Sequence, residues 1–259
     1  KTSESFYIFM TGLLVNYLIP IRAGEVAKSF ILKVRRNIPI SSSLPTVFID
    51  KISDLFPIVL IMILIPLTSI KLNSTLYIII GLLFVIFIFL IAFLFFAVNH
   101  HQKALKILNF FLKFIPAKLR DKTTTFFENF VNGMSVMKNR RQDNILVYLL
   151  TLCAVFSEAI YIFAVFKSFG AEISFAKILF GYTLMNLTYI LPTPPAQLGS
   201  NQFMWVLIFS FALGVDKNLT SAAVTFSHLL TSIWIFLIGA ISLISLKIKI
   251  TDLFPKFKK

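Results

Sequence analysis

The run Leu76–Val98 holds 23 consecutive residues without a charged side chain. A helix needs about 20 predominantly apolar residues to cross the hydrocarbon core of a bilayer, so a run of this length is typical of a transmembrane helix. Across its 259 residues the chain is 58% hydrophobic and 14% charged, whereas about a quarter of the residues in soluble domains are charged. The sequence therefore excludes a soluble globular domain and a disordered chain, and it predicts an all-α integral membrane protein.

Three more apolar runs predict further spans, at 52–70, 145–166 and 219–246. Their orientation follows from the positive charges, because cytoplasmic loops carry an excess of lysine and arginine. We therefore predict a multi-pass protein of the cell (inner) membrane whose basic segments and C-terminus are cytoplasmic. Of the 25 lysine and arginine residues, 21 lie at the N-terminal residue and in the basic segments 22–51, 100–142 and 247–259.

The net charge of +14 is explained by contact with lipid. Basic cytoplasmic segments are attracted to anionic inner-leaflet lipids. Segment 100–142 also carries apolar residues at helical spacing with lysine and arginine on the other faces, a pattern typical of helices that lie on a membrane surface. We predict anionic lipids as partners of this segment and no nucleic acid, and a homo-oligomer is compatible with the sequence.

Two apolar segments, 5–37 and 177–214, are interrupted by proline and glycine. The orientation above requires each of them to leave and re-enter the membrane on one side. The arm Phe203–Leu213 has eleven residues, about 16 Å as a helix against a hydrocarbon core of about 30 Å, so it is too short to span. We predict a polytopic helical bundle with two Pro/Gly-broken re-entrant hairpins, whose irregular backbone must be covered by protein or line a water-filled cavity.

The two halves of the chain share a weak internal repeat. Ser42–Phe48 resembles Thr220–Phe226 at an offset of 178 residues, and the break at 20–24 recurs at 195–199 at an offset of 175. Three predicted crossings separate the copies, so the copies would be inverted in the membrane, and paired broken segments in inverted halves indicate the binding site of a transporter. Chance similarity between two apolar helices is the alternative.

The repeat suggests one polytopic membrane domain over 1–259. Its parts are a first half-repeat at about 5–70, the cytoplasmic interfacial segment 100–142 and a second half-repeat at about 177–246.

The first break contains polar and charged residues next to proline and glycine: Asn16, Arg22 and Glu25. Charges at membrane depth are costly and usually mark a substrate or ion pathway. We predict that Arg22 clamps a phosphate through its bidentate guanidinium, with Glu25 as its ion-pair partner when the site is empty. The alternative is that both side chains reach the interface as anchors of a helix end.

The second break, 191–202, is a polar loop between two short apolar arms. A helix that starts after Gly199 would direct its free N–H groups at an anion, and Gln197, Asn201 and Gln202 would add neutral donors. We predict these four residues as substrate-binding; a plain extracellular turn is the alternative.

Four ionisable residues remain in or near the predicted spans. Asp50 and Asp54 lie one helical turn apart and share a face, so we include both in the predicted substrate site, with a role in proton or cation coupling; an ion pair with Lys51 at the interface is the alternative. Glu158 lies near the middle of a span, where a protonated carboxyl bonded to a neighbouring helix would also fit. His228, in a helix rich in serine and threonine, is typical of an interhelical hydrogen-bonding residue.

Enzyme signatures are absent from the sequence: we find no cluster with metal-ligand spacing, nucleophile elbow, Walker A loop or dinucleotide fingerprint. We therefore predict no catalytic residue, metal or cofactor. Two alternatives to transport stay open, a membrane enzyme acting on a phospholipid or polyprenyl-linked substrate and a non-transporting membrane partner of a separate synthase.

The motifs together resemble the flippase-like family that includes the transmembrane region of lysylphosphatidylglycerol synthases. The resemblance implies translocation of a phospholipid or lipid-linked headgroup without ATP hydrolysis. Members of that family usually begin with one or two further helices, so we expect a helix upstream of Lys1, and full synthases carry a soluble aminoacyl-transferase domain after the last span, where this chain has a short basic tail. The motifs are Asn16, Pro20, Arg22 and Gly24-Glu25; Asp50-Lys51 and Asp54; Leu191–Gly199; Gly214-Val215; and His228 and Gly239.

One position departs from the resemblance. The family usually has a glutamate three residues after the loop glycine, and this chain has Gln202. If the carboxylate serves proton coupling or headgroup binding, the activity of this chain should differ.

Overall fold

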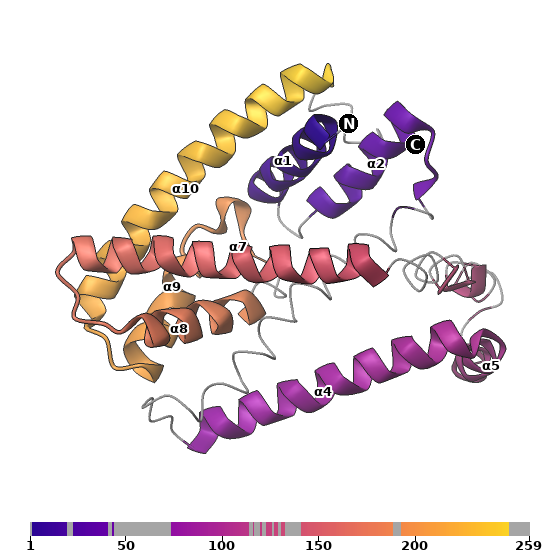
Figure 1. The fold of residues 1–259 in the computed structure, drawn as a ribbon, viewed down its shortest axis with the longest axis horizontal. Helices are drawn as coiled ribbons and strands as arrows, with labels where there is room; N and C mark the ends of the chain where they lie inside the picture. The colour runs from indigo at the N-terminus through magenta and orange to yellow at the C-terminus, as the bar shows by residue number, and fades with distance from the viewer. Residues whose placement is uncertain are drawn as a thin grey trace.

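The computed structural model is helical in every element that it describes (Figure 1), which confirms an all-α protein. The residues described are 2–19, 23–40, 43, 74–113, 116, 120, 123–125, 127–128, 131–132, 141–188 and 193–248. The elements are α1 (Thr2–Leu18), α2 (Gly24–Arg36), α4 (Ser74–Asn99), α5 (His101–Leu112), α7 (Arg141–Ser168), α8 (Phe175–Thr188), the 3₁₀ turn η2 (Pro195–Gln197), α9 (Ser200–Trp205), the π-helix η3 (Val206–Ala212) and α10 (Lys217–Leu246).

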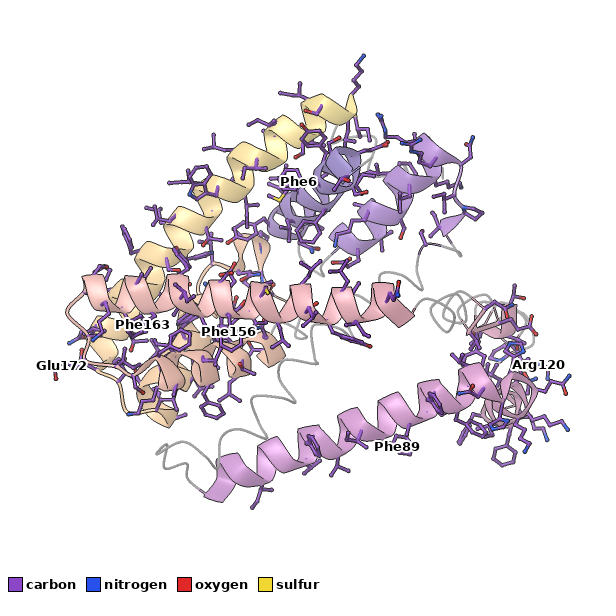
Figure 2. All side chains as sticks on the ribbon, viewed as in Figure 1. Phe6, Phe89, Arg120, Phe156, Phe163 and Glu172 are labelled. Carbon is purple, nitrogen blue, oxygen red and sulfur yellow. The ribbon has the colours of Figure 1, made fainter. Side chains whose placement is uncertain are left out.

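Among the residues that the structure describes, α7 over Ile145–Ser168 and α10 over Lys217–Leu246 are long and apolar enough to cross a membrane. Both coincide with predicted spans, and together with their composition they support a membrane protein. Large apolar side chains point outward from them and from α4, among them Phe156 and Phe89 in Figure 2. Such a surface suits hydrocarbon and not water. The charge-free run Leu76–Val98 lies within α4, and the predicted span 52–70 lies outside the described residues.

The first break in the chain separates α1 from α2, and α1 packs closely on both α2 and α10 (Figure 1). A Cβ atom placed on Gly24 would collide with the carbonyl oxygen of Gly12 and would lie 2.6 Å from Asn16 Oδ1. On the other side of α1, a Cβ on Gly239 would lie 2.7 Å from Leu14 Cβ. The two glycines therefore allow α1 to approach α2 and α10 more closely than larger residues would.

Charged groups tie the far ends of the same three helices. Glu4 at the start of α1 forms ion pairs with Arg35 and Arg36 at the end of α2. Arg35 also donates to the carbonyl oxygen of Leu246 at the end of α10, over 2.6 Å. The arginine hydrogen bonds, first that of Arg36 and then that of Arg35, hold the pKa of Glu4 below its ordinary value. This cluster satisfies a helix C-terminal carbonyl that would otherwise lack a partner.

The second short pair of helices, α8 and the continuous helix formed by α9 and η3, packs against α7 around aromatic rings. Phe166 of α7 stacks with Phe209 of η3, with ring centroids 5.1 Å apart, and Trp205 stacks on Phe209 at 4.9 Å. Gly181 of α8 lies directly against the Phe209 ring. The helix over 200–212 has 13 residues, close to the eleven of the predicted arm Phe203–Leu213, and Gly214, whose φ of +70° favours glycine, follows its end.

The polar segment after α4 forms the amphipathic helix α5, in which Ala104 and Leu112 are buried. This agrees with the first of the two helices expected in 100–142. Its place at a membrane surface stays a prediction, as do the re-entrant hairpins, the inverted repeat and the division into half-repeats.

Candidate functional site

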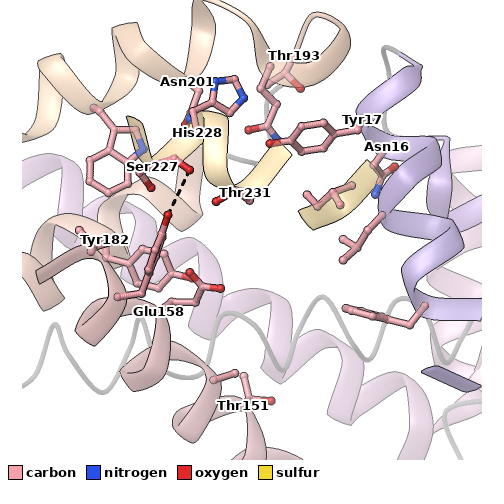
Figure 3. Close-up of a pocket in the computed structure, with 18 of the residues that line it drawn as sticks. Asn16, Tyr17, Thr151, Glu158, Tyr182, Thr193, Asn201, Ser227, His228 and Thr231 are labelled. Carbon is pink, nitrogen blue, oxygen red and sulfur yellow. Dashed lines mark hydrogen bonds between the residues drawn. The ribbon is translucent and has the colours of Figure 1, made fainter. Parts of the chain in front are cut away.

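A cavity of about 690 Å³ lies where the two Pro/Gly-broken segments meet α7 and α10. We call it the central cavity. Figure 3 shows its wall: Asn16 and Tyr17 come from α1, Thr151 and Glu158 from α7, and Asn201 and His228 from α9 and α10. A volume of this size is in the range of small-molecule sites, and the wall is rich in hydroxyl, amide and ionisable groups although the surrounding helices are apolar.

On the α1–α2 side, the cavity wall contains an ion pair. Lys28 Nζ lies 3.0 Å from Glu25 Oε2, one turn apart on α2, and 4.8 Å from the centre of the Phe9 ring. Lys28 is 9% exposed, and its stem packs over Gly12, where a Cβ would come within 2.6 Å of Lys28 Cε. Gly12 thus provides the space in which a lysine is buried beside the cavity.

The start of α2 is capped from the preceding helix. Asn16 Oδ1 accepts a hydrogen bond from the Gly24 backbone N–H over 2.7 Å. This bond satisfies one of the N–H groups that a helix leaves unpaired at its first turn. Asn16 therefore holds the break between the two helices and lines the central cavity at the same time.

Hydrogen bonds from Gln202 and from His228 of α10 stabilise the second break. Gln202 Oε1 accepts from the Gly199 N–H (2.9 Å), and Gln202 Nε2 lies 3.0 Å from His228 Nδ1. His228 Nε2 lies 2.8 Å from the carbonyl oxygen of Ala196. A carbonyl only accepts, so Nε2 carries the proton and Nδ1 accepts from the Gln202 amide. The imidazole in this arrangement is neutral and serves as an interhelical bond, as its sequence context predicted.

This network includes Gln202, for which the sequence predicted a contact with substrate. The sequence predicted a helix start with free N–H groups and Gln202 as a donor to substrate. In the structure both polar atoms of the Gln202 amide are engaged by the protein, and its oxygen covers the Gly199 N–H. Ala196 and Gln197 adopt φ of +51° and +56°, a conformation that costs non-glycine residues about 1 kcal/mol each. The bonds from α10 stabilise this turn.

The wall of the central cavity also carries a carboxylate and an unsatisfied amide. Glu158 of α7 forms no ion pair with any residue that the structure describes, and it lines the central cavity. Asn201 Oδ1 is buried and has no hydrogen-bond partner among the described residues. Buried polar atoms are nearly always bonded, so such an atom in a cavity wall indicates a place for a ligand or water.

The structure brings some of the predicted site residues together. Asn16, Glu25, Gln197 and Asn201 line the central cavity, and Gly199 and Gln202 form the loop beside it. Arg22, Asp50 and Asp54 lie outside the described residues. Among the described residues there is no group of three or more histidine, cysteine, aspartate or glutamate side chains that could hold a metal ion.

Sequence reasoning missed Lys28 and the three tyrosines of the wall, Tyr17, Tyr161 and Tyr182. The spacing of Glu25 and Lys28, three residues apart on an amphipathic helix, is a signal for an ion pair. Nothing local to the tyrosines distinguishes them from lipid-facing aromatic residues.

Comparisons with known proteins show that the chain is similar to membrane proteins. The family described as "Lysylphosphatidylglycerol synthase TM region" matches residues 1–239. A UPF0104 membrane protein of Methanocaldococcus jannaschii is 25% identical over 235 residues, which cover 88% of this chain and 92% of that protein. Two UPF0104 membrane proteins of Methanothermobacter thermautotrophicus are 24% identical, covering 88% and 92% of this chain and 71% and 72% of their own lengths. No solved structure matches.

Proposed function

This chain belongs to the lysylphosphatidylglycerol synthase TM region family, and we propose that it moves the polar headgroup of a phospholipid or lipid-linked substrate across the membrane without ATP hydrolysis. The observation that carries the proposal is the central cavity itself. Its polar wall lies between the apolar helices α7 and α10. A headgroup in hydrocarbon loses its hydrogen bonds at a cost of several kcal/mol, and a polar cavity between spans lowers that cost.

The chemistry of the wall supports a phosphate-containing headgroup. Lys28 supplies a buried cation, and Asn16, Gln197 and Asn201 supply amides on the facing elements. Glu25 neutralises Lys28 at rest, and a lipid phosphate would compete for the same ammonium. We retain Arg22 in this role as well, since it lies between the end of α1 and the start of α2 in the sequence, and Asp50 and Asp54 as candidates for ion coupling.

The lengths of the helices support re-entrant hairpins. α1 has 17 residues, α2 has 13, α8 has 14 and the helix over 200–212 has 13. At 1.5 Å per residue they measure about 20–26 Å, less than the roughly 30 Å of a hydrocarbon core. We propose that the pairs α1–α2 and α8–η3 enter the membrane from opposite faces as the broken elements of an inverted repeat. We also propose that segments 100–142 and 247–259 contact anionic lipid on the cytoplasmic side of the cell (inner) membrane.

In this function the chain is a transporter without cofactor or catalytic residue. Reconstitution of the purified protein into vesicles tests it. Purified protein in vesicles of phosphatidylglycerol and phosphatidylethanolamine should accelerate the loss of a headgroup-labelled lipid from the inner leaflet, measured by an impermeant quencher. Mass spectrometry of the vesicle lipids should find no new product. A new lipid product would favour a membrane enzyme, and vesicles indistinguishable from protein-free ones would favour the role of a non-transporting partner.

A matched pair of variants assigns the movement to the central cavity. Asn201→Leu keeps the side-chain size but removes the unpaired amide, and we expect translocation to slow about 5- to 10-fold, the effect of one lost hydrogen bond of about 1–1.4 kcal/mol. Asn218→Leu makes the same change at an exposed position near the start of α10 and should leave the rate unchanged. Equal rates for the two variants would remove the central cavity from the mechanism.

Arg22 is tested separately. Arg22→Lys keeps the positive charge but loses the bidentate fork, so it should slow translocation more than Arg140→Lys in the basic segment 100–142. Melting temperatures of both variants in detergent distinguish loss of the phosphate contact from loss of the fold.

A further inference from the structure

A second cavity of about 580 Å³ lies between α1, α7 and α10. We call it the lateral groove. It shares part of its wall with the central cavity, namely Ala154, Glu158 and Tyr161 of α7 and Thr231 and Ile235 of α10. The two spaces are therefore neighbours along one seam between α7 and α10.

The lining changes at this seam from polar in the central cavity to mostly apolar in the lateral groove. Beyond it the groove is lined by Met10, Leu230 and Trp234, and its one further hydroxyl, that of Ser157, donates to the Cys153 carbonyl of its own helix over 2.8 Å. On the near side lie the amides and the ion pair of the central cavity. At the seam itself, Tyr161 Oη donates to the Ser227 carbonyl over 3.3 Å, and the Glu158 carboxylate stands beside it.

The groove faces the surface of the molecule that suits hydrocarbon. Trp234 at its edge is 61% exposed, and apolar side chains continue along α10 on either side of it, including Ile233 and Leu237. A molecule that fills both spaces must be apolar at one end, where it meets this surface, and polar at the other, where it meets the central cavity.

We propose that the lateral groove binds the hydrocarbon tail of the lipid whose headgroup occupies the central cavity. The substrate class is then a membrane amphiphile that enters sideways between α7 and α10, with Glu158, Tyr161 and Thr231 at the level where tail and headgroup join. A soluble headgroup without a tail would fill only half of the site. This inference rests on the proposed function, and it adds the entry path and the tail as a recognised part of the substrate.

Ala154 is the residue at which the groove is most simply closed. It belongs to both walls and its methyl group leaves the seam open. Ala154→Phe fills this space. Ala164→Phe makes the same change ten residues further along α7, at an exposed position that lines neither the central cavity nor the lateral groove.

The test uses the whole chain in vesicles of phosphatidylglycerol and phosphatidylethanolamine doped with a phosphatidylglycerol that carries a diazirine on one acyl chain. After illumination, lipid adducts are mapped by mass spectrometry. We expect adducts at Leu230 and Trp234, reduced at least fivefold in Ala154→Phe and unchanged in Ala164→Phe, while adducts at Ile241 on the outer surface of α10 stay constant in both. Translocation should fall in Ala154→Phe alone.

A second pair covers the case in which Ala154→Phe does not fold. Leu230→Gln makes the groove polar at nearly constant volume and should also deplete the groove adducts, whereas Leu237→Gln, on the exposed face of the same helix, should not. Groove adducts that persist in Ala154→Phe and Leu230→Gln would show ordinary surface lipid and overturn the proposal. Disulfide-linked dimers formed through Ser157→Cys would show a second copy in the groove and overturn it as well.

These outcomes separate the inference from the function on which it rests. If Asn201→Leu slows translocation and Ala154→Phe does not, the central cavity transports lipid but the groove is not its entry path. If the wild-type protein moves no lipid, the proposed function fails, and the adduct pattern still decides whether the groove holds a tail.

Discussion

The turn between α1 and α2 and the loop 193–199 both interrupt apolar helices beside the central cavity, yet their polar groups are satisfied differently. At the first, Asn16 of the preceding helix accepts from the Gly24 N–H, and the adjacent wall carries the Glu25–Lys28 ion pair. At the second, Gln202 accepts from the Gly199 N–H within its own helix and is tied to α10 through neutral His228. One break places charge at the cavity, and the other places neutral amides there.

The two breaks therefore differ in what stabilises them. Beside the first break, α2 lies so close to α1 that Gly24 has no space for a side chain, and this contact between the two helices is fixed by packing. The second break depends on hydrogen bonds, of which the one between His228 and Ala196 joins residues 32 positions apart in the sequence. Each of these hydrogen bonds can break without the others. We therefore expect the first break to fail abruptly when altered and the second to loosen.

The largest effect is expected from Gly24→Ala. Its Cβ would meet the Gly12 carbonyl, which is backbone and cannot turn aside, so α1 and α2 must separate. We expect a loss of about 3 kcal/mol, the upper end of the usual cost of overpacking, seen as a lower melting temperature in detergent. Gly81→Ala in α4, where no atom lies within 4 Å of the new Cβ, should be neutral or stabilising. A wild-type melting temperature for Gly24→Ala would refute rigid packing at the first break.

A smaller effect is expected from His228→Phe at the second break. The ring is retained, but the contacts to Gln202 and Ala196 are lost and leave both partners unpaired, which should cost about 2 kcal/mol. Hydrogen exchange should accelerate in 196–202 and stay unchanged in α2. Equal acceleration in both regions would mean that the two breaks are not independent.

A loss of about 1 kcal/mol is expected from Asn16→Ala, because one helix-start N–H loses its acceptor. Asn16→Asp supplies an acceptor at the same place and should recover most of the stability. The comparison uses melting temperatures at neutral pH. If Asp and Ala behave alike, the hydrogen bond to Gly24 does not hold the turn.

The smallest effect concerns the far end of the α1–α2 pair. Because Arg36 and Arg35 lower the pKa of Glu4 in the folded protein, their stabilisation is fully present above the pKa of the unfolded chain, near 4.3, and is lost as pH falls through the lower folded pKa. Glu4→Gln should therefore melt below wild type at pH 7, and the gap should close in acid. Glu172→Gln, at an exposed loop position, should show no gap. A gap that persists below the folded pKa would exclude the ion pairs as its source.

Much of the fold could be predicted from the sequence because a membrane helix is a continuous run of apolar residues, which is a local pattern. Hydrophobic runs placed α4, α7 and α10, and proline and glycine placed both breaks within a few residues. The apolar arm 203–213 is only eleven residues long, and this length alone predicted a helix as short as the one observed over 200–212.

The site was predictable only where its polar groups stand inside apolar segments, as do Asn16, Asn201 and Glu158. The burial of Lys28 depends on Gly12 in another helix, and the pairing of Gln202 with His228 depends on how α10 passes the loop. Such relations are set by tertiary packing, which no local pattern contains. The pairing of Gln202 within the protein could for this reason not be predicted, and its role as a substrate donor stays a prediction.

The close approach of Leu14 to Gly239 also concerns how the chain is made. α1 packs chiefly against α10, and the two contact residues Leu14 and Gly239 lie more than two hundred residues apart in the sequence, so α1 is synthesised long before its partner exists. Contacts so distant in sequence form late and leave intermediates exposed. During that interval Asn16 of α1 has no cavity to line. Membrane insertase or chaperone contact with α1 is expected to last until α10 is inserted, and release should coincide with closure of the bundle.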